Sequence, residues 1–284
     1  MSAGCGVGAS MNGKLTVSMP RVLPTRARNS SRRGIDAWFG LLICADASAH
    51  AGSAQSWWSF DPWVWGGFAL LLLLRPRRPA SFLLAGAALF LALIWPLDVL
   101  AETSFAAHMA QHMLLIGVAA PLLVLSRSSL GPVKVLSRGG KRRVARLLRG
   151  WSTLSRPPVA FALHGAAVWI GHSPRVIEAM ILQRWVHILG HAVLLATALI
   201  FWWSLRSRGR AGAGNAALWT LATMVHTGML GALLAFAPRT LYPAYSLSDQ
   251  QLAGLIMWVP GALCYLAAGL VFAAAWLGDE RRPA

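Results

Sequence analysis

Seven apolar runs divide the chain, and each approaches the length that a helix needs to cross a lipid bilayer. The hydrocarbon core of a membrane requires a helix of about 20 apolar residues. Backbone polar groups inside a bilayer must hydrogen-bond to one another, so runs of this kind predict helices. The fourth run is the shortest. The seven runs cover approximately residues 57–74, 80–97, 104–125, 157–171, 185–203, 216–237 and 252–277.

The overall composition is that of a membrane protein. Hydrophobic residues make up 56% of the 284 residues and charged residues only 12%, which is about half the charged share of a soluble domain. We therefore predict an all-α integral membrane protein with seven transmembrane helices. The three cysteines lie far apart and form no CxxC motif, which argues against a disulfide framework and against a thiolate metal site.

The net charge of +17 would suit a nucleic-acid-binding protein, but the placement of the charges indicates a membrane topology. After residue 33, Lys and Arg cluster at 75–78, 127–156, 206–210 and 281–282, after alternate runs. Such clusters mark the cytoplasmic side. The opposite loops hold Asp98, Glu102, Glu178 and Asp249. The first helix is therefore predicted to begin outside and the chain to end in the cytoplasm, in a bacterial cytoplasmic (inner) membrane, with no nucleic acid as a partner.

The chain is predicted to have a basic N-terminal region, 1–50, and a seven-helix membrane domain, 51–284. Arg32 and Arg33 precede a short apolar run, and Ala47-Ser48-Ala49 has the small-x-small form of a cleavage site. This pattern resembles a secretory signal peptide, with an uncleaved interfacial segment as the alternative. The basic loop 127–156 is predicted to be an amphipathic helix on lipid headgroups or a solvated loop.

Seven histidines lie within or at the ends of four of the runs, at or above the predicted midplane on the outer side. Ionisable residues inside a membrane are costly and usually functional. His108 and His112 are four residues apart, as are His187 and His191, so each pair shares one helix face. Imidazole is the commonest metal ligand. The candidate metal ligands are His108, His112, His164, His172, His187, His191, His226 and Met257.

Each of these residues also has a purely structural interpretation. A single buried histidine often serves only as a hydrogen-bonded packing residue, and methionine commonly fills gaps in a core. Asp249 lies where the last helix is predicted to begin. It can orient an imidazole through a hydrogen bond, or it can cap the N-terminus of the last helix.

The residue types narrow the choice of metal. Imidazole suits copper, zinc and iron, and thioether sulfur shifts the preference toward Cu(I). Carboxylates are scarce in the runs, which disfavours Mg²⁺ and Ca²⁺. Neither histidine pair contains the glutamate of a zinc-hydrolase HExxH motif. Haem held by two histidines from facing helices remains the rival to copper.

Four segments, HMAQHMLL, WVHILGHAVLLATALIFWW, GALLAFAPRTLYPAY and DQQLAGLIMWVPG, occur in this order. They resemble the CtaG-like cytochrome c oxidase assembly factors of the Bacillus type, over roughly residues 57–277. The resemblance implies a seven-helix membrane protein needed to build active haem–copper oxidase. It carries over to His108, Gln111, His112, Met113, His172, His187, His191, Asp249, Gln250, Gln251, Met257 and Trp258. Among these, Gln111 and Asp249 are not expected to bind the metal. Each is expected to orient a metal ligand through a hydrogen bond.

The predicted function is therefore that of an assembly factor, not an enzyme. The protein is expected to bind copper through an outward-facing cluster of His and Met side chains and to deliver it to a haem–copper oxidase. The expected partners are cytochrome c oxidase subunits, the lipid bilayer and other copper chaperones. The alternatives are a haem-binding membrane electron carrier or haem-delivery factor, and a metal-free assembly scaffold.

Overall fold

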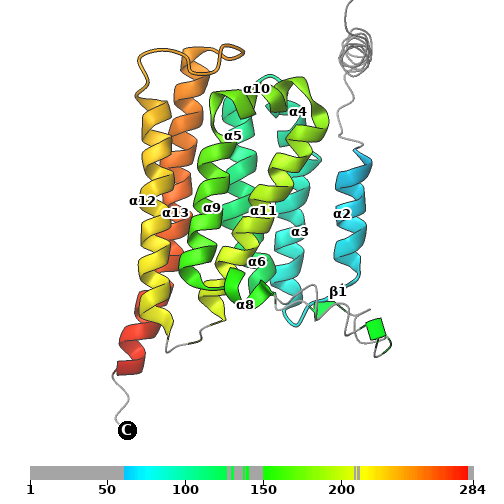
Figure 1. Cartoon of the computed structure of the whole chain (residues 1–284), viewed down its shortest axis with the longest axis vertical. Coiled ribbons are helices and arrows are strands. Elements are labelled where there is room, and N and C mark those ends of the chain that lie inside the picture. The colour runs from blue at the N-terminus through cyan, green and yellow to red at the C-terminus, as the bar shows by residue number, and fades with distance from the viewer. Residues whose placement is uncertain are drawn as a thin grey trace, which may run out of the picture. The chain divides into compact units, whose positions relative to one another are not determined.

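Apolar helices dominate the described part of the chain (Figure 1). The computed structural model describes residues 61–126, 129–130, 137, 139–140, 150–207, 209 and 212–280, all within the compact unit Ser56–Ala284. The predicted signal peptide and most of the predicted surface helix in loop 127–156 lie outside these residues.

Five of the described helices are long and apolar enough to cross a membrane. The first combines α3 (Pro79–Leu93) with α4 (Leu97–Ala101), and the second combines α5 (Phe105–Met113), η1 (Leu114–Ala119) and α6 (Ala120–Leu125). The others are α11 (Arg184–Arg206), α12 (Ala213–Ala235) and α13 (Leu247–Glu280). Two shorter apolar helices, α2 (Pro62–Leu72) and α9 (Pro157–Gly171), correspond to the first and fourth predicted runs. The prediction of a multi-helix membrane fold is confirmed to this extent.

Several short elements were not predicted. Between α9 and α11 the chain forms α10 (Pro174–Leu182), and α8 (Trp151–Leu154) precedes α9. A two-residue strand, β1 (Leu74–Arg75), pairs antiparallel with β2 (Ser129–Leu130). The proline at the first position of α10 favours helix initiation there, but elements this short leave little periodic pattern in a sequence.

The central helical segment contains one irregular turn whose cause lies in the sequence. In the π-helix η1, the N–H of Ala120 donates to the carbonyl of Leu115, five residues earlier. The next N–H in this pattern would belong to Pro121, which has none. The freed carbonyl of Ile116 instead accepts a hydrogen bond of 2.8 Å from the indole Nε1 of Trp202 in α11. Pro121 therefore helps to join α11 to the helix that carries His108 and His112.

Glycines allow α12 and α13 to pack backbone against backbone. A Cβ atom added to Gly254 would lie 2.6 Å from the carbonyl oxygen of Gly231 and would also clash with the backbone nitrogen of Ala235. Small residues at a helix contact are typical of membrane bundles, where backbones approach closely. This contact fixes the first turns of α13 against the last turns of α12.

Candidate metal centre

Five imidazole rings from three helical segments meet toward one end of the bundle. His108 and His112 come from α5, His187 and His191 from α11, and His172 immediately follows α9. Their ring centroids lie 4.4 to 5.3 Å apart in the pairs 108–112, 108–187, 108–191, 112–172, 112–191 and 187–191. These five side chains are called the histidine cluster.

Three members of the cluster have the spacing of a metal site. One ring nitrogen from each of His108, His187 and His191 lies within 4.8 Å of the other two. His187 is half-buried, whereas His108 and His191 are only 5% and 6% exposed. A metal ion can therefore be held by this triad, and His112 adjoins it through ring contacts with His108 and His191.

Several nitrogens of the cluster are buried without a hydrogen-bond partner among the described residues. They are Nε2 of His108, Nδ1 of His112 and Nε2 of His191. A buried polar atom left without a partner costs about 1–3 kcal/mol, so such atoms are rare in folded proteins. Three of them at one place indicate a donor set that a bound cation would satisfy.

His172 is held by contacts to its ring and by a hydrogen bond to its backbone carbonyl. Its Nδ1 lies 2.6 Å from the carbonyl oxygen of Val168, and its Nε2 lies 3.2 Å from the Sδ atom of Met109. Its own carbonyl accepts a hydrogen bond of 2.7 Å from the hydroxyl of Tyr242. Burial lowers the pKa of His172, against the opposing effect of the Val168 hydrogen bond. Burial raises the pKa of Tyr242 to about 12, so its hydroxyl keeps the proton that it donates.

Asp249 fixes the start of α5. Its carboxylate accepts hydrogen bonds from the hydroxyl of Ser104 at 3.0 Å, from the backbone N–H of Phe105 at 2.6 Å and from that of Ala106 at 3.2 Å. These partners belong to the first turn of α5 and none is an imidazole. A carboxylate at a helix N-terminus stabilises the helix dipole. On α13 itself, the Ser246 hydroxyl accepts from the N–H of Asp249. Asp249 thus caps the neighbouring helix that carries His108 and His112.

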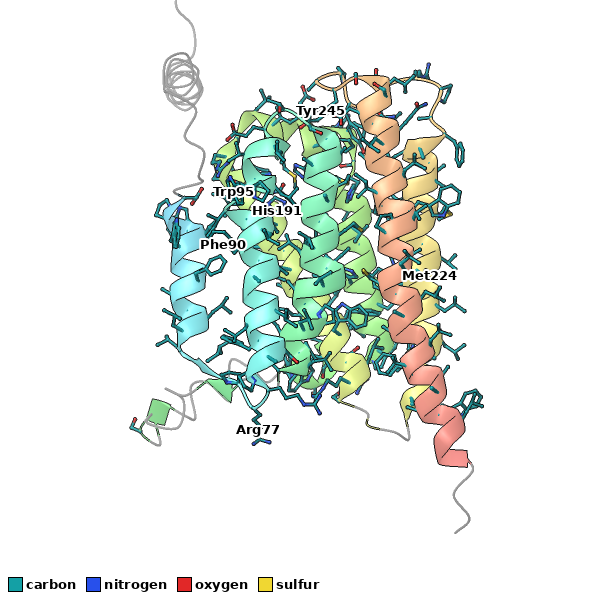
Figure 2. The ribbon with its side chains drawn as sticks, turned by 180° about the vertical axis from the view of Figure 1, so that it is seen from behind. Arg77, Phe90, Trp95, His191, Met224 and Tyr245 are labelled. Atoms are coloured by element: carbon teal, nitrogen blue, oxygen red, sulfur yellow. The ribbon has the colours of Figure 1, made fainter. Side chains whose placement is uncertain are left out.

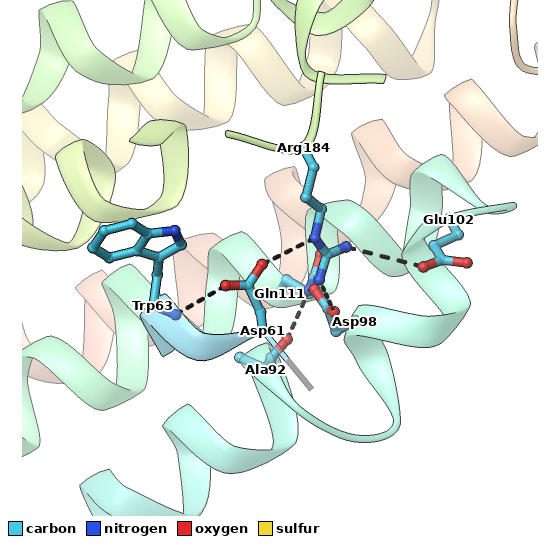
Figure 3. A network of polar contacts seen from close by, with 7 residues as sticks. All are labelled: Asp61, Trp63, Ala92, Asp98, Glu102, Gln111 and Arg184. Carbon is cyan, nitrogen blue, oxygen red and sulfur yellow. Dashed lines mark hydrogen bonds and ion pairs between the residues drawn. The ribbon is translucent and has the colours of Figure 1, made fainter. Parts of the chain in front are cut away.

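An ion-pair network lies next to the cluster, around the first residue of α11 (Figure 3). The guanidinium of Arg184 lies 3.0 Å from a carboxylate oxygen of Asp98, 3.3 Å from one of Asp61 and 3.9 Å from one of Glu102. The side-chain amide of Gln111 donates to Asp98 at 3.3 Å and to the carbonyl of Ala92 at 2.7 Å. Gln111 therefore joins α5 to this network.

Residues 68–279 match the model of one family, the cytochrome c oxidase caa3 assembly factors. The chain belongs to this family. The matched segment spans most of the chain and includes the whole histidine cluster. No curated protein and no solved structure matched in the corresponding searches. Membership confirms the resemblance noted in the sequence, indicates a non-enzymatic role, and implies that this assembly factor acts together with cytochrome c oxidase.

The histidine cluster does not include three of the predicted ligands of the assembly factor, His164, His226 and Met257. His164 is two turns before His172 on α9, about 12 Å along the helix axis, and its ring nitrogens are 3.3 Å from the hydroxyls of Thr197 and Tyr265. The ring of His226 packs against Phe161 at 5.2 Å. Met257 is buried in the hydrophobic core on α13.

Two contributors to the site of the assembly factor were missed by reasoning from the sequence. Methionine in an apolar run is expected to be a packing residue, although the position of Met109 between His108 and His112 places it on the same helix as the ligand pair. Two acids of the Arg184 network, Asp98 and Glu102, entered the sequence prediction only as markers of the outer side, and Asp61 did not enter it. The appearance of Asp98 and Arg184 just before two histidine-bearing helices was the available signal for their role.

Proposed function

We propose that this assembly factor binds copper, as Cu(I), in the histidine cluster and passes it to a haem–copper oxidase subunit during assembly. The observation that carries the proposal is the triad of His108, His187 and His191, whose ligand nitrogens lie within 4.8 Å of one another. Imidazole ligands suit copper, and the thioether of Met109 beside His172 favours its reduced form. Copper is cargo here, and no substrate is chemically converted.

The spacing of the rings favours a bare ion over haem. Two axial histidines bind haem iron from opposite faces of the macrocycle, so the macrocycle must fit between their rings. The rings that face each other from α5 and α11 are already close, with centroids 5.1 Å apart for His108 and His187, 5.3 Å for His108 and His191 and 5.0 Å for His112 and His191. These distances leave no gap for a macrocycle between rings from the two helices.

Metal analysis of the purified protein, combined with its visible spectrum, tests the proposal. Protein produced with added copper should contain at least one copper ion per chain and should show no Soret band. A Soret band with stoichiometric iron would favour haem binding or haem delivery. Protein that binds neither copper nor haem under reducing conditions would favour a metal-free scaffold, and the copper proposal would be abandoned.

We further propose that all seven apolar helices cross the inner membrane, with the first helix beginning outside and α13 ending in the cytoplasm. Positive loops mark the cytoplasmic side. Figure 2 supports the arrangement: Arg77 lies at one end of the bundle and Tyr245 at the other, with His191 nearer to Tyr245. The cluster would then lie in the outer half of the membrane.

Cysteine labelling tests this orientation. In a chain whose native cysteines are replaced, a cysteine at Ala244 should react with a membrane-impermeant thiol reagent in intact spheroplasts. A cysteine at Gly139, in the basic loop, should react only after the membrane is permeabilised. Gly139 and Ala244 are both exposed, so burial inside the protein would not explain a difference in labelling between them. Equal labelling of the two in intact spheroplasts would show that the orientation is wrong.

A further inference from the structure

We infer that the histidine cluster contains two copper sites of different softness. The first is the triad of His108, His187 and His191. The second consists of His172 and Met109, with His112 beside them. This inference rests on the proposed copper function and divides its site in two.

The hydrogen bond to Val168 fixes which nitrogen of His172 is available to a metal. A carbonyl oxygen can only accept a hydrogen bond, so the Nδ1 atom 2.6 Å from it carries the ring proton. In the neutral imidazole the other nitrogen, Nε2, then holds a lone pair and no hydrogen. This is the tautomer in which a metal-binding histidine is commonly held, with its N–H fixed by an oxygen acceptor.

The available nitrogen of His172 faces another atom that has no hydrogen to give. The Sδ atom of Met109 lies 3.2 Å from Nε2, and a thioether sulfur is only a weak acceptor. Both side chains are buried, with His172 5% and Met109 0% exposed. Two lone pairs therefore point toward each other in a place that water does not reach. A cation bound to both would turn an unfavourable contact into two bonds.

The distance between the two atoms fits a shared ion. Metal–imidazole bonds are about 2.0 Å long and metal–sulfur bonds about 2.3 Å. At ligand–metal–ligand angles of 90° to 120°, the two ligand atoms lie about 3.0 to 3.7 Å apart. The observed 3.2 Å lies in this range. Because thioether is a soft ligand, the pair should prefer Cu(I) over Zn²⁺ and Cu²⁺.

His112 lies between the triad and the pair formed by His172 and Met109. Its ring centroid is 5.3 Å from that of His172, 5.0 Å from that of His191 and 4.5 Å from that of His108. Its Nδ1 is buried without a hydrogen-bond partner. A Cu(I) ion can therefore keep a bond to His112 while it exchanges the remaining ligands of one site for those of the other. All of these ligands are neutral, so the exchange moves no proton and changes no oxidation state.

The test compares Met109→Leu with Met229→Leu in the full-length protein in detergent. Leucine replaces methionine at similar volume, and Met229 is 51% exposed on α12. Cu(I) is titrated without oxygen against a chromophoric Cu(I) chelator, and X-ray absorption reports the atoms bound to copper. The wild type and Met229→Leu should each bind two Cu(I) ions per chain and show a sulfur neighbour. Met109→Leu should bind one Cu(I) and lose the sulfur neighbour, while Co²⁺ binding at the triad stays unchanged.

The possible failures are distinguishable. If the wild type binds Cu(I) but shows no sulfur neighbour, or if Met109→Leu keeps both ions at unchanged affinity, the second site is overturned and the copper function stands. If the wild type binds no Cu(I), the proposed function itself fails. If Met109→Leu does not fold, His172→Gln gives the same comparison, because it removes the other ligand of the pair.

Discussion

A chain with both His108 and His191 replaced by alanine should insert into the membrane normally but lose the metal bound at the triad. Each single replacement removes a ligand and should weaken binding by at least about 100-fold, since loss of even a supporting residue costs about 10–100-fold. The double variant should be little worse than either single variant, because residues that serve one site are strongly non-additive. Oxidase activity in the membranes should fall with the bound copper, while the oxidase polypeptides are still made.

His164→Leu is the matched control. This histidine is also fully buried in a helix, but its ring nitrogens face hydroxyl groups of Thr197 and Tyr265. Its replacement should lower the melting temperature through lost hydrogen bonds and leave copper binding intact. Nε2 of His108 and Nε2 of His191 have no hydrogen-bond partner among the described residues, so the apoprotein should be destabilised less by the removal of these two side chains. Normal copper content of the oxidase in the double variant would show that the cluster does not serve delivery, and the scaffold alternative would replace it.

Much of the architecture could be predicted because bilayer thickness and backbone hydrogen bonding leave few options. The bounds predicted for the fourth run, 157–171, coincide with α9. The HxxxH spacing predicted that His108 and His112 share a helix face, as do His187 and His191. The first run was expected over 57–74, whereas the described helix is Pro62–Leu72. Asp61 caps this helix by accepting from Trp63, a signal that hydropathy alone does not use.

The supporting contacts could not be predicted because they join residues that are distant in sequence. Asp249 caps a helix that begins 144 residues earlier. Arg184 reaches Asp98 across 86 residues and Asp61 across 123 residues. A short-range pattern indicates which face of a helix a residue occupies, but not which helix packs against that face. The pairing of Met109 with His172 was hidden for the same reason, since a methionine in an apolar run is indistinguishable from a packing residue.

Replacing Arg184 by methionine should be among the most destabilising single changes in the bundle. The side chains of Asp98 and Asp61 are only 6% and 8% exposed, and the change would leave both without their shared cation. Removing one partner of a buried ion pair costs about 3–5 kcal/mol, chiefly because the other charge stays buried. Arg184 itself is 43% exposed, so water offsets part of this loss, and we expect about 2–3 kcal/mol. A lower melting temperature in detergent would measure it.

Other residues of the Arg184 network provide a control variant. They also provide a double variant that tests whether the unpaired carboxylates cause the loss of stability. Glu102 lies 3.9 Å from Arg184 and is 58% exposed, so Glu102→Gln should cost less than about 1 kcal/mol, as exposed ion pairs do. Adding Asp98→Asn to Arg184→Met removes one of the stranded carboxylates and should recover part of the stability, because residues in one network are coupled. Copper affinity should fall with Arg184→Met as well, since Arg184 begins the helix that carries His187 and His191. If Arg184→Met is no more harmful than Glu102→Gln, the network does not hold α11 against α4, and the cluster is positioned by helix packing alone.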